Sequence, residues 1–305
     1  MNLLDRITGL YGLLISNNKV INHLYGPLRY IIRVMANYSL PRYLNKQAFH
    51  ESEKVLEEKI IVSLTSYPAR INNVWMVIEC MLRQTIKPYK IILWLSQEQF
   101  PSKEILPKSL LERENDVFII RLVKEDIRSH KKYYYASKEY PDDLVFLIDD
   151  DIFYPTTILE RSLKNYNLYP HSVISNYGCQ IAFDDNGKHL PYLTWGEIKT
   201  NDNIFFGSGG GTLYCPRDLH NDLTNISLAL KLTPSADDIW LNAMARLVGT
   251  KVISVSNMQI LPIYNDHSED LSQINIGLSD DGLSNNDKQL EALESYYGRC
   301  FDKKR

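Results

Sequence analysis

The hydrophobic pattern of the chain becomes regular after residue 58. Short, continuous apolar runs then alternate with longer segments in which apolar residues recur at helical spacing. Four runs have the length and the Val and Ile content of strands covered on both faces, and they occupy residues 59–65, 90–95, 117–122 and 144–148. Strands that alternate with helices indicate βαβ units, so the pattern predicts an α/β fold around a mostly parallel sheet.

Three consecutive carboxylates, Asp149, Asp150 and Asp151, directly follow the fourth predicted strand. Ligands of open α/β sheets bind at the carboxyl ends of such strands. If the extended conformation continues, Asp149 and Asp151 point to the same side, because strand side chains alternate. Two carboxylates on one side suit a hard divalent cation, Mg²⁺ or Mn²⁺, that can hold a diphosphate. The alternative is an acidic turn whose side chains accept only local backbone donors.

A glycine-rich segment, Gly207 to Thr212, lies later in the chain. It has threonine where a dinucleotide-binding loop needs its third glycine, and the chain contains no GK[ST] motif, so neither type of nucleotide site is predicted. We expect a flexible loop in which Gly209, Gly210 and Gly211 let a bulky ligand approach the backbone closely. A plain hairpin or linker is the alternative.

A second acidic group, Asp237 and Asp238, stands at the predicted start of a helix with Gly249 just past its end. A carboxylate at this position can act as a general base, and we expect the helix dipole to keep it ionised. The alternative role is structural, because Ser235 and Asp238 have the spacing of a capping box.

Length, charge and cysteine content limit the possible functions. A chain of 305 residues can bury a substantial core without disulfides. The net charge of −3 offers no basic surplus to neutralise phosphates, so nucleic-acid binding is not expected. The four cysteines are scattered without a CxxC pair, which indicates free thiols in a reducing compartment.

Residues 1–49 differ in character from the rest of the chain. Their longest apolar stretch, residues 7–15, is too short to span a bilayer, and we expect no cleaved signal peptide. Two interpretations stay open: a segment that lies on an anionic membrane surface, or a helical extension packed on the main domain. We therefore expect a cytoplasmic protein, free or peripheral on the inner face of the plasma membrane. Against one acid, Asp5, the segment carries Arg6, Lys19, Arg29, Arg33, Arg42 and Lys46.

Together these motifs resemble those of GT-A glycosyltransferases, of the kind that build bacterial capsule or lipopolysaccharide chains. The resemblance covers roughly residues 59–270. It implies the GT-A fold, which is Rossmann-like, with residues 1–58 as an N-terminal helical extension. Within the catalytic domain, 59–305, it implies a nucleotide-binding half at 59–155, an acceptor and catalytic half at 156–270, and a tail helix in 271–305. The motifs that carry it are the Thr65-Ser66-Tyr67-Pro68-Ala69-Arg70 loop, the Asp triplet as a DxD motif, the glycine-rich segment, and Ala236-Asp237-Asp238 at a helix start.

The resemblance also implies a role for each residue. The donor would be a nucleotide-diphosphate sugar, and the acceptor a glycan or a lipid-linked oligosaccharide. Asp238, or failing that Asp237, would take the proton from the acceptor hydroxyl, with inversion at the anomeric carbon. Asp151, Asp149 and His267 would bind Mn²⁺ or Mg²⁺. The donor would contact Thr65, Tyr67, Arg70, Asp149, Asp150 and Lys132, or Lys131 in place of Lys132, and Gly209, Gly210 and Gly211 would border the donor sugar and the acceptor.

Two other functions fit fewer of these features. A non-catalytic carbohydrate- or metal-binding protein would use some of the twenty tyrosines as sugar platforms. A phosphatase of the haloacid dehalogenase type also has an Asp-x-Asp motif after a strand. It needs Thr or Val where this chain has Phe153, and its motif follows the first strand instead of the fourth.

Overall fold

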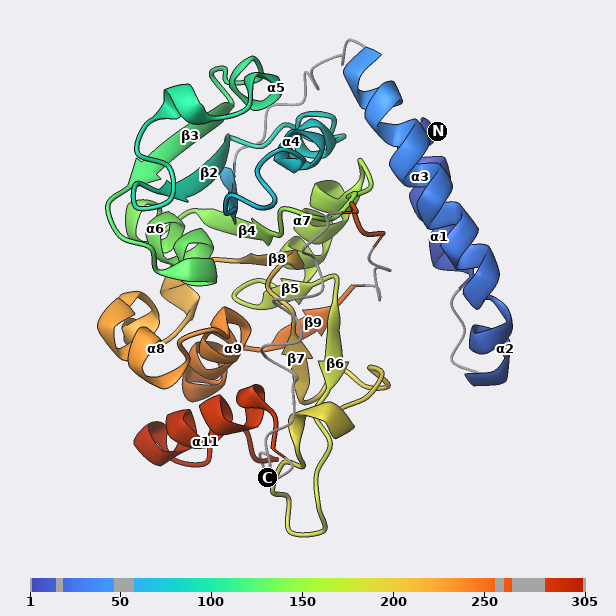
Figure 1. Cartoon of the computed structure of the whole chain (residues 1–305). Coiled ribbons are helices and arrows are strands. Elements are labelled where there is room, and N and C mark those ends of the chain that lie inside the picture. The colour runs from blue at the N-terminus through green and yellow to red at the C-terminus, as the bar shows by residue number, and fades with distance from the viewer. Residues whose placement is uncertain (1, 15–18, 47–57, 256–260, 265–282, 304–305) are drawn as a thin grey trace.

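A seven-stranded sheet forms the centre of the molecule in the computed structural model, which describes residues 2–14, 19–46, 58–255, 261–264 and 283–303 (Figure 1). The strand order is β3-β2-β1-β4-β8-β5-β9. The four predicted strands are all present: β1 (Ile60–Thr65), β2 (Lys90–Ser96), β3 (Phe118–Val123) and β4 (Leu144–Ile148). They pair in parallel, which confirms the predicted α/β architecture for this half of the sheet.

The second half of the sheet contains one strand of opposite direction. Strand β8 (Gly210–Tyr214) runs antiparallel to β4 on one side and to β5 (Val173–Ser175) on the other. Strand β9 (Val252–Ser254) then pairs in parallel with β5. Because β8 is antiparallel, its first residue, Gly210, lies opposite Ile148 at the end of β4. The direction of β8 therefore places the glycine-rich segment beside the Asp triplet.

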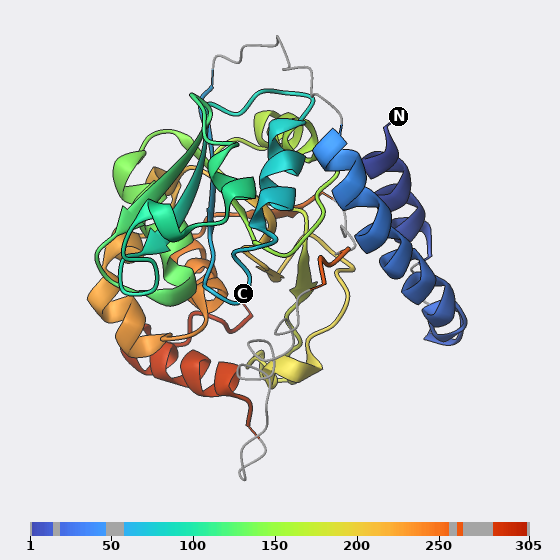
Figure 2. The same cartoon turned by 45° about the horizontal axis from the view of Figure 1, so that its top comes forward.

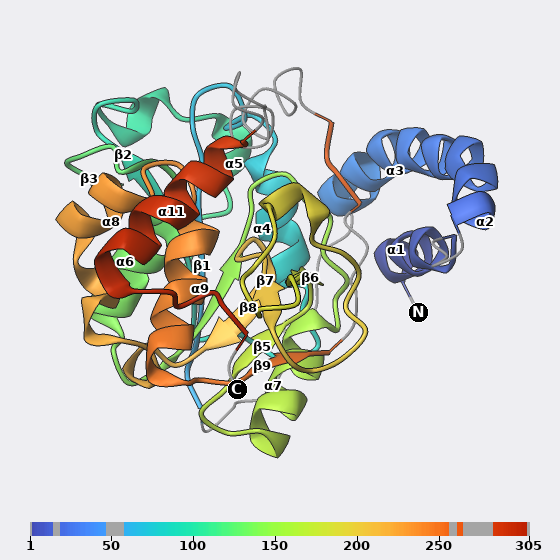
Figure 3. The same cartoon turned by 90° about the horizontal axis from the view of Figure 1, so that it is seen from below.

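Helices cover both faces of the sheet, as Figures 2 and 3 show. Side chains of β4 alternate between two cores, because successive residues of a strand point to opposite faces. Phe146 and Ile148 join the core with α4 (Val74–Leu82) and α7 (Ile158–Leu168). Val145 and Leu147 enter the other core, which includes residues of α6 (Lys131–Glu139), α8 (Ile226–Leu232), α9 (Asp237–Val248) and α11 (Asn285–Tyr297). The fold also contains a short helix, α5 (Lys108–Leu111), and a two-stranded sheet. The small sheet consists of β6 (Gly178–Gln180) and β7 (Ile204–Phe206).

The N-terminal segment is helical, as predicted, and lies along one flank of the molecule (Figure 1). It consists of α1 (Leu3–Leu13), α2 (Lys19–Leu24) and α3 (Gly26–Lys46). The Asp5 carboxylate accepts hydrogen bonds from the backbone N–H and the hydroxyl of Thr156, at 2.8 and 2.7 Å. The Asn37 side chain donates to the carbonyl of Pro262 at 2.9 Å. The extension therefore packs on the main domain. Within the described ranges, no helix is both long and apolar enough to cross a membrane.

The two ends of α9 compare differently with what the sequence suggested. Ser235 does not cap α9: its backbone N–H donates to the Gln289 side chain at 3.0 Å, and the N-cap residue is Ala236. The capping box, which was the alternative role for Asp238, is therefore absent, because a contact with α11 replaces it. The left-handed Gly249 does end α9, as predicted. A capping box is present instead at α11, between Ser284 and Asp287.

Candidate active site

The three consecutive carboxylates at the end of β4 have different environments. The Asp150 side chain is only 7% exposed; it accepts hydrogen bonds from the Ser66 hydroxyl and from Arg70 at 2.9 Å. Asp151 is 20% exposed and pairs with the same Arg70 nitrogen at 2.8 Å. Asp149 is 42% exposed and pairs with Lys132 at 2.8 Å. Asp149 and Asp151 are thus the members that solvent reaches, whereas Asp150 holds the triplet against the loop after β1.

That loop contributes the residues predicted to line a nucleotide pocket. Thr65, Tyr67 and Arg70 follow or end β1, at the sheet edge where β4 delivers the Asp triplet. Tyr67 is partly exposed, and the Arg70 guanidinium lies 5.5 Å from the centre of its ring. The Thr65 hydroxyl donates to the carbonyl of Trp94 at 2.8 Å. Arg70 is paired with Asp150 and Asp151, so its observed contacts position the triplet.

The glycine-rich segment is a buried turn into β8, so the prediction of a flexible loop is wrong. A Cβ added to Gly209 would lie 1.7 Å from Oδ2 of Asp149, and one on Gly210 would lie 2.2 Å from Cβ of Tyr177. Gly211 has a φ of +93°, which L side chains rarely adopt. The glycines are required because protein groups, including the Asp149 carboxylate, pack against their backbone.

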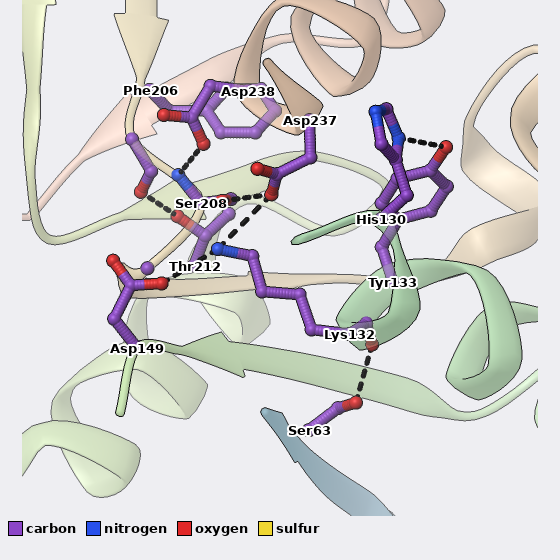
Figure 4. Close-up of polar contacts among 12 residues, drawn as sticks. Ser63, His130, Lys132, Tyr133, Asp149, Phe206, Ser208, Thr212, Asp237 and Asp238 are labelled. Atoms are coloured by element: carbon purple, nitrogen blue, oxygen red, sulfur yellow. Dashed lines mark hydrogen bonds and ion pairs between the residues drawn. The ribbon is translucent and has the colours of Figure 1, made fainter. Parts of the chain in front are cut away.

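A single lysine links the triplet to the second acidic group, as Figure 4 shows. Lys132 lies in the first turn of α6, and its ammonium is 2.8 Å from Asp149 and 3.1 Å from Asp237. The side chain is 5% exposed. Burial lowers the pKa of Lys132, but the carboxylates of Asp149, Asp237 and Asp238 outweigh it and raise the pKa above its usual value. Lys131, the other candidate, pairs with Asp126 instead.

Ser208 forms a hydrogen bond with each of the two carboxylates of the α9 pair, Asp237 and Asp238 (Figure 4). The Ser208 hydroxyl donates to Asp237 at 2.8 Å, and its backbone N–H donates to Oδ1 of Asp238 at 2.7 Å. Burial opposes ionisation of Asp237, but the neighbouring Lys132 holds its pKa below the usual range. Burial, together with the charge of Asp237, raises the pKa of Asp238 to about 6. With a pKa of about 6, Asp238 is mostly ionised at neutral pH, and the contribution of the helix dipole stays a prediction.

The charges of the site fit a bound divalent cation. Five carboxylates, from the Asp triplet and the pair on α9, meet two cationic side chains, Lys132 and Arg70, which leaves three negative charges when all are ionised. Burial, reinforced by Asp150 and Asp149, raises the pKa of Asp151 to about 7, as expected where negative charge is incompletely balanced. Exposed carboxylate oxygens are the donors that Mg²⁺ and Mn²⁺ prefer. Within the triplet, Asp149 and Asp151 are the carboxylates that solvent reaches, so they could hold such an ion. His267, the third predicted ligand, lies outside the described residues.

Three residues that the sequence did not single out fix this geometry. The Tyr154 hydroxyl accepts from the backbone N–H of Asp149 at 2.9 Å and donates to the carbonyl of Gly209. The Asn242 amide donates to the carbonyls of Phe206 and Asp238, both at 2.8 Å. Ser208 was visible only as part of a glycine-rich segment. Asn242 lies four residues after Asp238, on the same face of α9, and this spacing is the one sequence signal that could have indicated it.

The fold and the site define an α/β protein with an acidic site at the carboxyl edge of its parallel strands. No protein-family model and no curated protein sequence matches the chain. Among solved structures, it is similar to the mannosyltransferase PcManGT from Pyrobaculum calidifontis in complex with GDP-Man and Mn²⁺. That similarity has 14% identity and a TM-score of 0.43, and covers 85% of this chain and 68% of the other. HddC from Yersinia pseudotuberculosis is also similar, with 14% identity, a TM-score of 0.34, and coverage of 53% and 78%. Similarity at this level defines no family and no activity for the chain.

Proposed function

We propose that the protein is a metal-dependent glycosyltransferase of the GT-A type, which moves a sugar from a nucleotide-diphosphate sugar to an acceptor hydroxyl. The observation that carries the proposal is the Lys132 bridge, because it joins two acidic groups that are distant in sequence into one site. Transfer of this kind needs a cationic site for the diphosphate and a separate base for the acceptor. The Asp triplet and the α9 pair supply these two halves.

Asp238 is the residue we assign as the base. Asp237 is bonded to both Lys132 and Ser208, and its pKa is held low, so it is a poor proton acceptor. Asp238 is partly exposed, and one of its oxygens is fixed by the Ser208 N–H. Its pKa of about 6 lies close to neutrality, where a general base is most effective. A carboxylate base that activates the acceptor for direct displacement predicts inversion at the anomeric carbon.

The other half of the site binds the donor. A divalent cation held by Asp149 and Asp151 would bridge the diphosphate and neutralise the charge that develops on the leaving nucleotide. Tyr67, partly exposed at the same edge, would stack on the nucleotide base. Lys132 positions Asp149 and Asp237. Its ammonium is already paired with these two carboxylates, and its side chain is 5% exposed. We therefore assign Lys132 to positioning the two carboxylates, in place of the predicted contact with the donor phosphates.

The acceptor we propose is a glycan or lipid-linked oligosaccharide in bacterial surface polysaccharide synthesis, and this part rests on the sequence resemblance alone. Asp150 is buried and bonded to Ser66 and Arg70, so we assign it to holding the loop instead of contacting the donor. The glycines of the 207–211 segment border the site through their backbone.

The test is release of nucleoside diphosphate from a panel of nucleotide sugars, with and without Mn²⁺. We expect metal-dependent release that rises with acceptor. Asp238→Asn should keep donor binding in a thermal-shift assay but lose transfer. Asp142→Asn, a substitution at a side chain that is 76% exposed, is the matched control and should retain both. Donor binding without any turnover would identify a non-catalytic binding protein instead, and the absence of any effect of sugar nucleotide or metal would refute the proposal altogether.

A further inference from the structure

Exposed apolar side chains are concentrated on the N-terminal helices. Among the residues that the structure describes, twenty-three large apolar side chains are exposed, and thirteen of them lie between Leu3 and Tyr38. The most exposed are Leu13 at 79%, and Val20 and Leu24 at 68% each. Isolated exposed apolar residues are ordinary, but a concentration of this kind marks a surface that contacts a partner or a membrane.

Helix α3 has two distinct apolar faces. Ile32, Ala36, Leu40 and Leu44, spaced four residues apart, are buried against the rest of the protein. A second set has the spacing i, i+3, i+7 and i+10 and is exposed by 45 to 66%: Leu28, Ile31, Met35 and Tyr38. At 100° per residue this second row points away from the first. The packing on the main domain therefore accounts for one face of α3 and leaves the other uncovered.

Helix α1 repeats the arrangement on a smaller scale. Leu4 and Tyr11 are buried, whereas Leu3, Leu10 and Leu13 are exposed, again at i, i+7 and i+10. Arg6 is exposed at the i+3 position of the same row. Helices α1 and α3 lie side by side on the flank of the molecule, as all three views show (Figure 3).

The charge of these helices is opposite to that of the remaining chain. Residues 1–46 contain six basic residues and one acid, a net charge of +5, so the remaining residues carry −8 of the total of −3. The single acid, Asp5, is bonded to Thr156 and faces the main domain. Arg42 and Lys46 are exposed and continue the outer row of α3 toward its end. The Arg42 guanidinium stacks 3.7 Å from the centre of the Tyr38 ring.

We infer that this face, formed by the outer rows of α1 and α3 together with α2, is a docking surface for an anionic lipid membrane. Aliphatic side chains can enter the acyl boundary, tyrosines suit the headgroup level, and the exposed arginines and lysine meet lipid phosphates. A protein partner would have to supply a matching acidic and apolar surface, whereas an anionic bilayer supplies both properties. The proposal goes beyond glycosyl transfer and does not depend on it.

The test is sedimentation of the full-length protein with vesicles of phosphatidylglycerol mixed with phosphatidylcholine, and with vesicles of phosphatidylcholine alone. We expect binding to the mixed vesicles that weakens as salt is raised. Replacing Leu13, Leu24 and Met35 with serine should reduce binding at least tenfold, because these side chains no longer enter the apolar layer. Arg6→Gln with Arg42→Gln should reduce it by roughly twenty- to thirtyfold, since each basic residue near the surface contributes about fivefold.

The matched control replaces three aliphatic side chains that are exposed elsewhere, Ile105, Leu168 and Val248, with serine. This variant should bind vesicles like the wild type, and both serine variants should keep the wild-type melting temperature, because only exposed side chains change. No sedimentation of the wild type, or equal loss in the control, would overturn the proposal. Self-association that disappears in the Leu13, Leu24 and Met35 variant, without vesicle binding, would assign the face to a second copy of the chain and would equally overturn it.

Discussion

Replacing Lys132 with methionine tests whether one buried cation holds the two acidic groups together. The change leaves Asp237, 9% exposed, and Asp149, 42% exposed, without their shared partner. Breaking a buried ion pair by removing one member destabilises a protein by about 3–5 kcal/mol. Water screens the exposed Asp149, so most of the effect comes from Asp237, and we expect a loss near the lower end, about 3 kcal/mol. For a chain of this size that corresponds to a melting temperature lower by roughly 5 °C.

The loss should depend on pH in a defined direction. Lys132 holds the pKa of Asp237 below its usual 3.8, so this stabilisation is present above pH 3.8 and is lost as the pH falls through the folded-state value. The difference in the free energy of unfolding between wild type and variant should therefore be largest at pH 7 and should decrease in strong acid. Chemical denaturation at several pH values measures it.

Two further variants make the reasoning refutable. Lys138→Met, on the exposed side of the same helix, should change the free energy of unfolding by no more than about 0.5 kcal/mol. Adding Asp237→Asn to Lys132→Met should recover part of the stability, because the uncompensated charge is removed. If Lys132→Met melts like the wild type at pH 7, or if the second substitution only adds to the loss, the bridge does not hold the site.

Three other predictions concern the same structure. The rate of transfer should rise with pH through about 6, because Asp238 must be ionised to accept a proton; a pH profile of kcat/KM that is flat from pH 5 to 8 would contradict this. Gly209→Ala should destabilise the protein by about 1–3 kcal/mol and weaken metal-dependent donor binding, whereas Gly196→Ala, whose Cβ would have open space, should do neither. The Glu294 carboxylate raises the pKa of His189. Stabilisation by this pair is therefore present below pH 6.5 and is lost as the pH rises through the folded-state pKa, so His189→Gln should destabilise the protein more at pH 5.5 than at pH 8.5.

The hydrophobic pattern predicted the parallel half of the sheet well. The bounds of β4 agree with the apolar run that precedes Asp149, because a strand buried on both faces must be apolar throughout. The same rule placed the three carboxylates at the correct edge. It could not decide which of them faces solvent, because that depends on Ser66 and Arg70, which are far away in sequence and occupy Asp150.

The direction of β8 was not predictable from its composition. Apolar content indicates a strand but not whether its neighbours run parallel or antiparallel, and the antiparallel pairing is what brings Gly209 against Asp149. The capping box considered as an alternative at Ser235 does not form, for a related reason. Its local hydrogen bond competes with a contact to Gln289, and the tertiary contact prevails. The Lys132 bridge likewise needs the folded chain, since no local pattern relates a lysine to an aspartate more than a hundred residues later.

The position of β8 also has a consequence for synthesis of the chain. Strands β1 to β4 can pair as soon as residue 148 has emerged from the ribosome, but β4 then has an open edge until β8, at Gly210–Tyr214, is available to cover it. An uncovered, fully apolar edge strand is a template for pairing with another chain. During the synthesis of about sixty residues, the nascent protein is thus most exposed to aggregation at β4, and chaperones that bind extended apolar segments are expected to act on it in this interval.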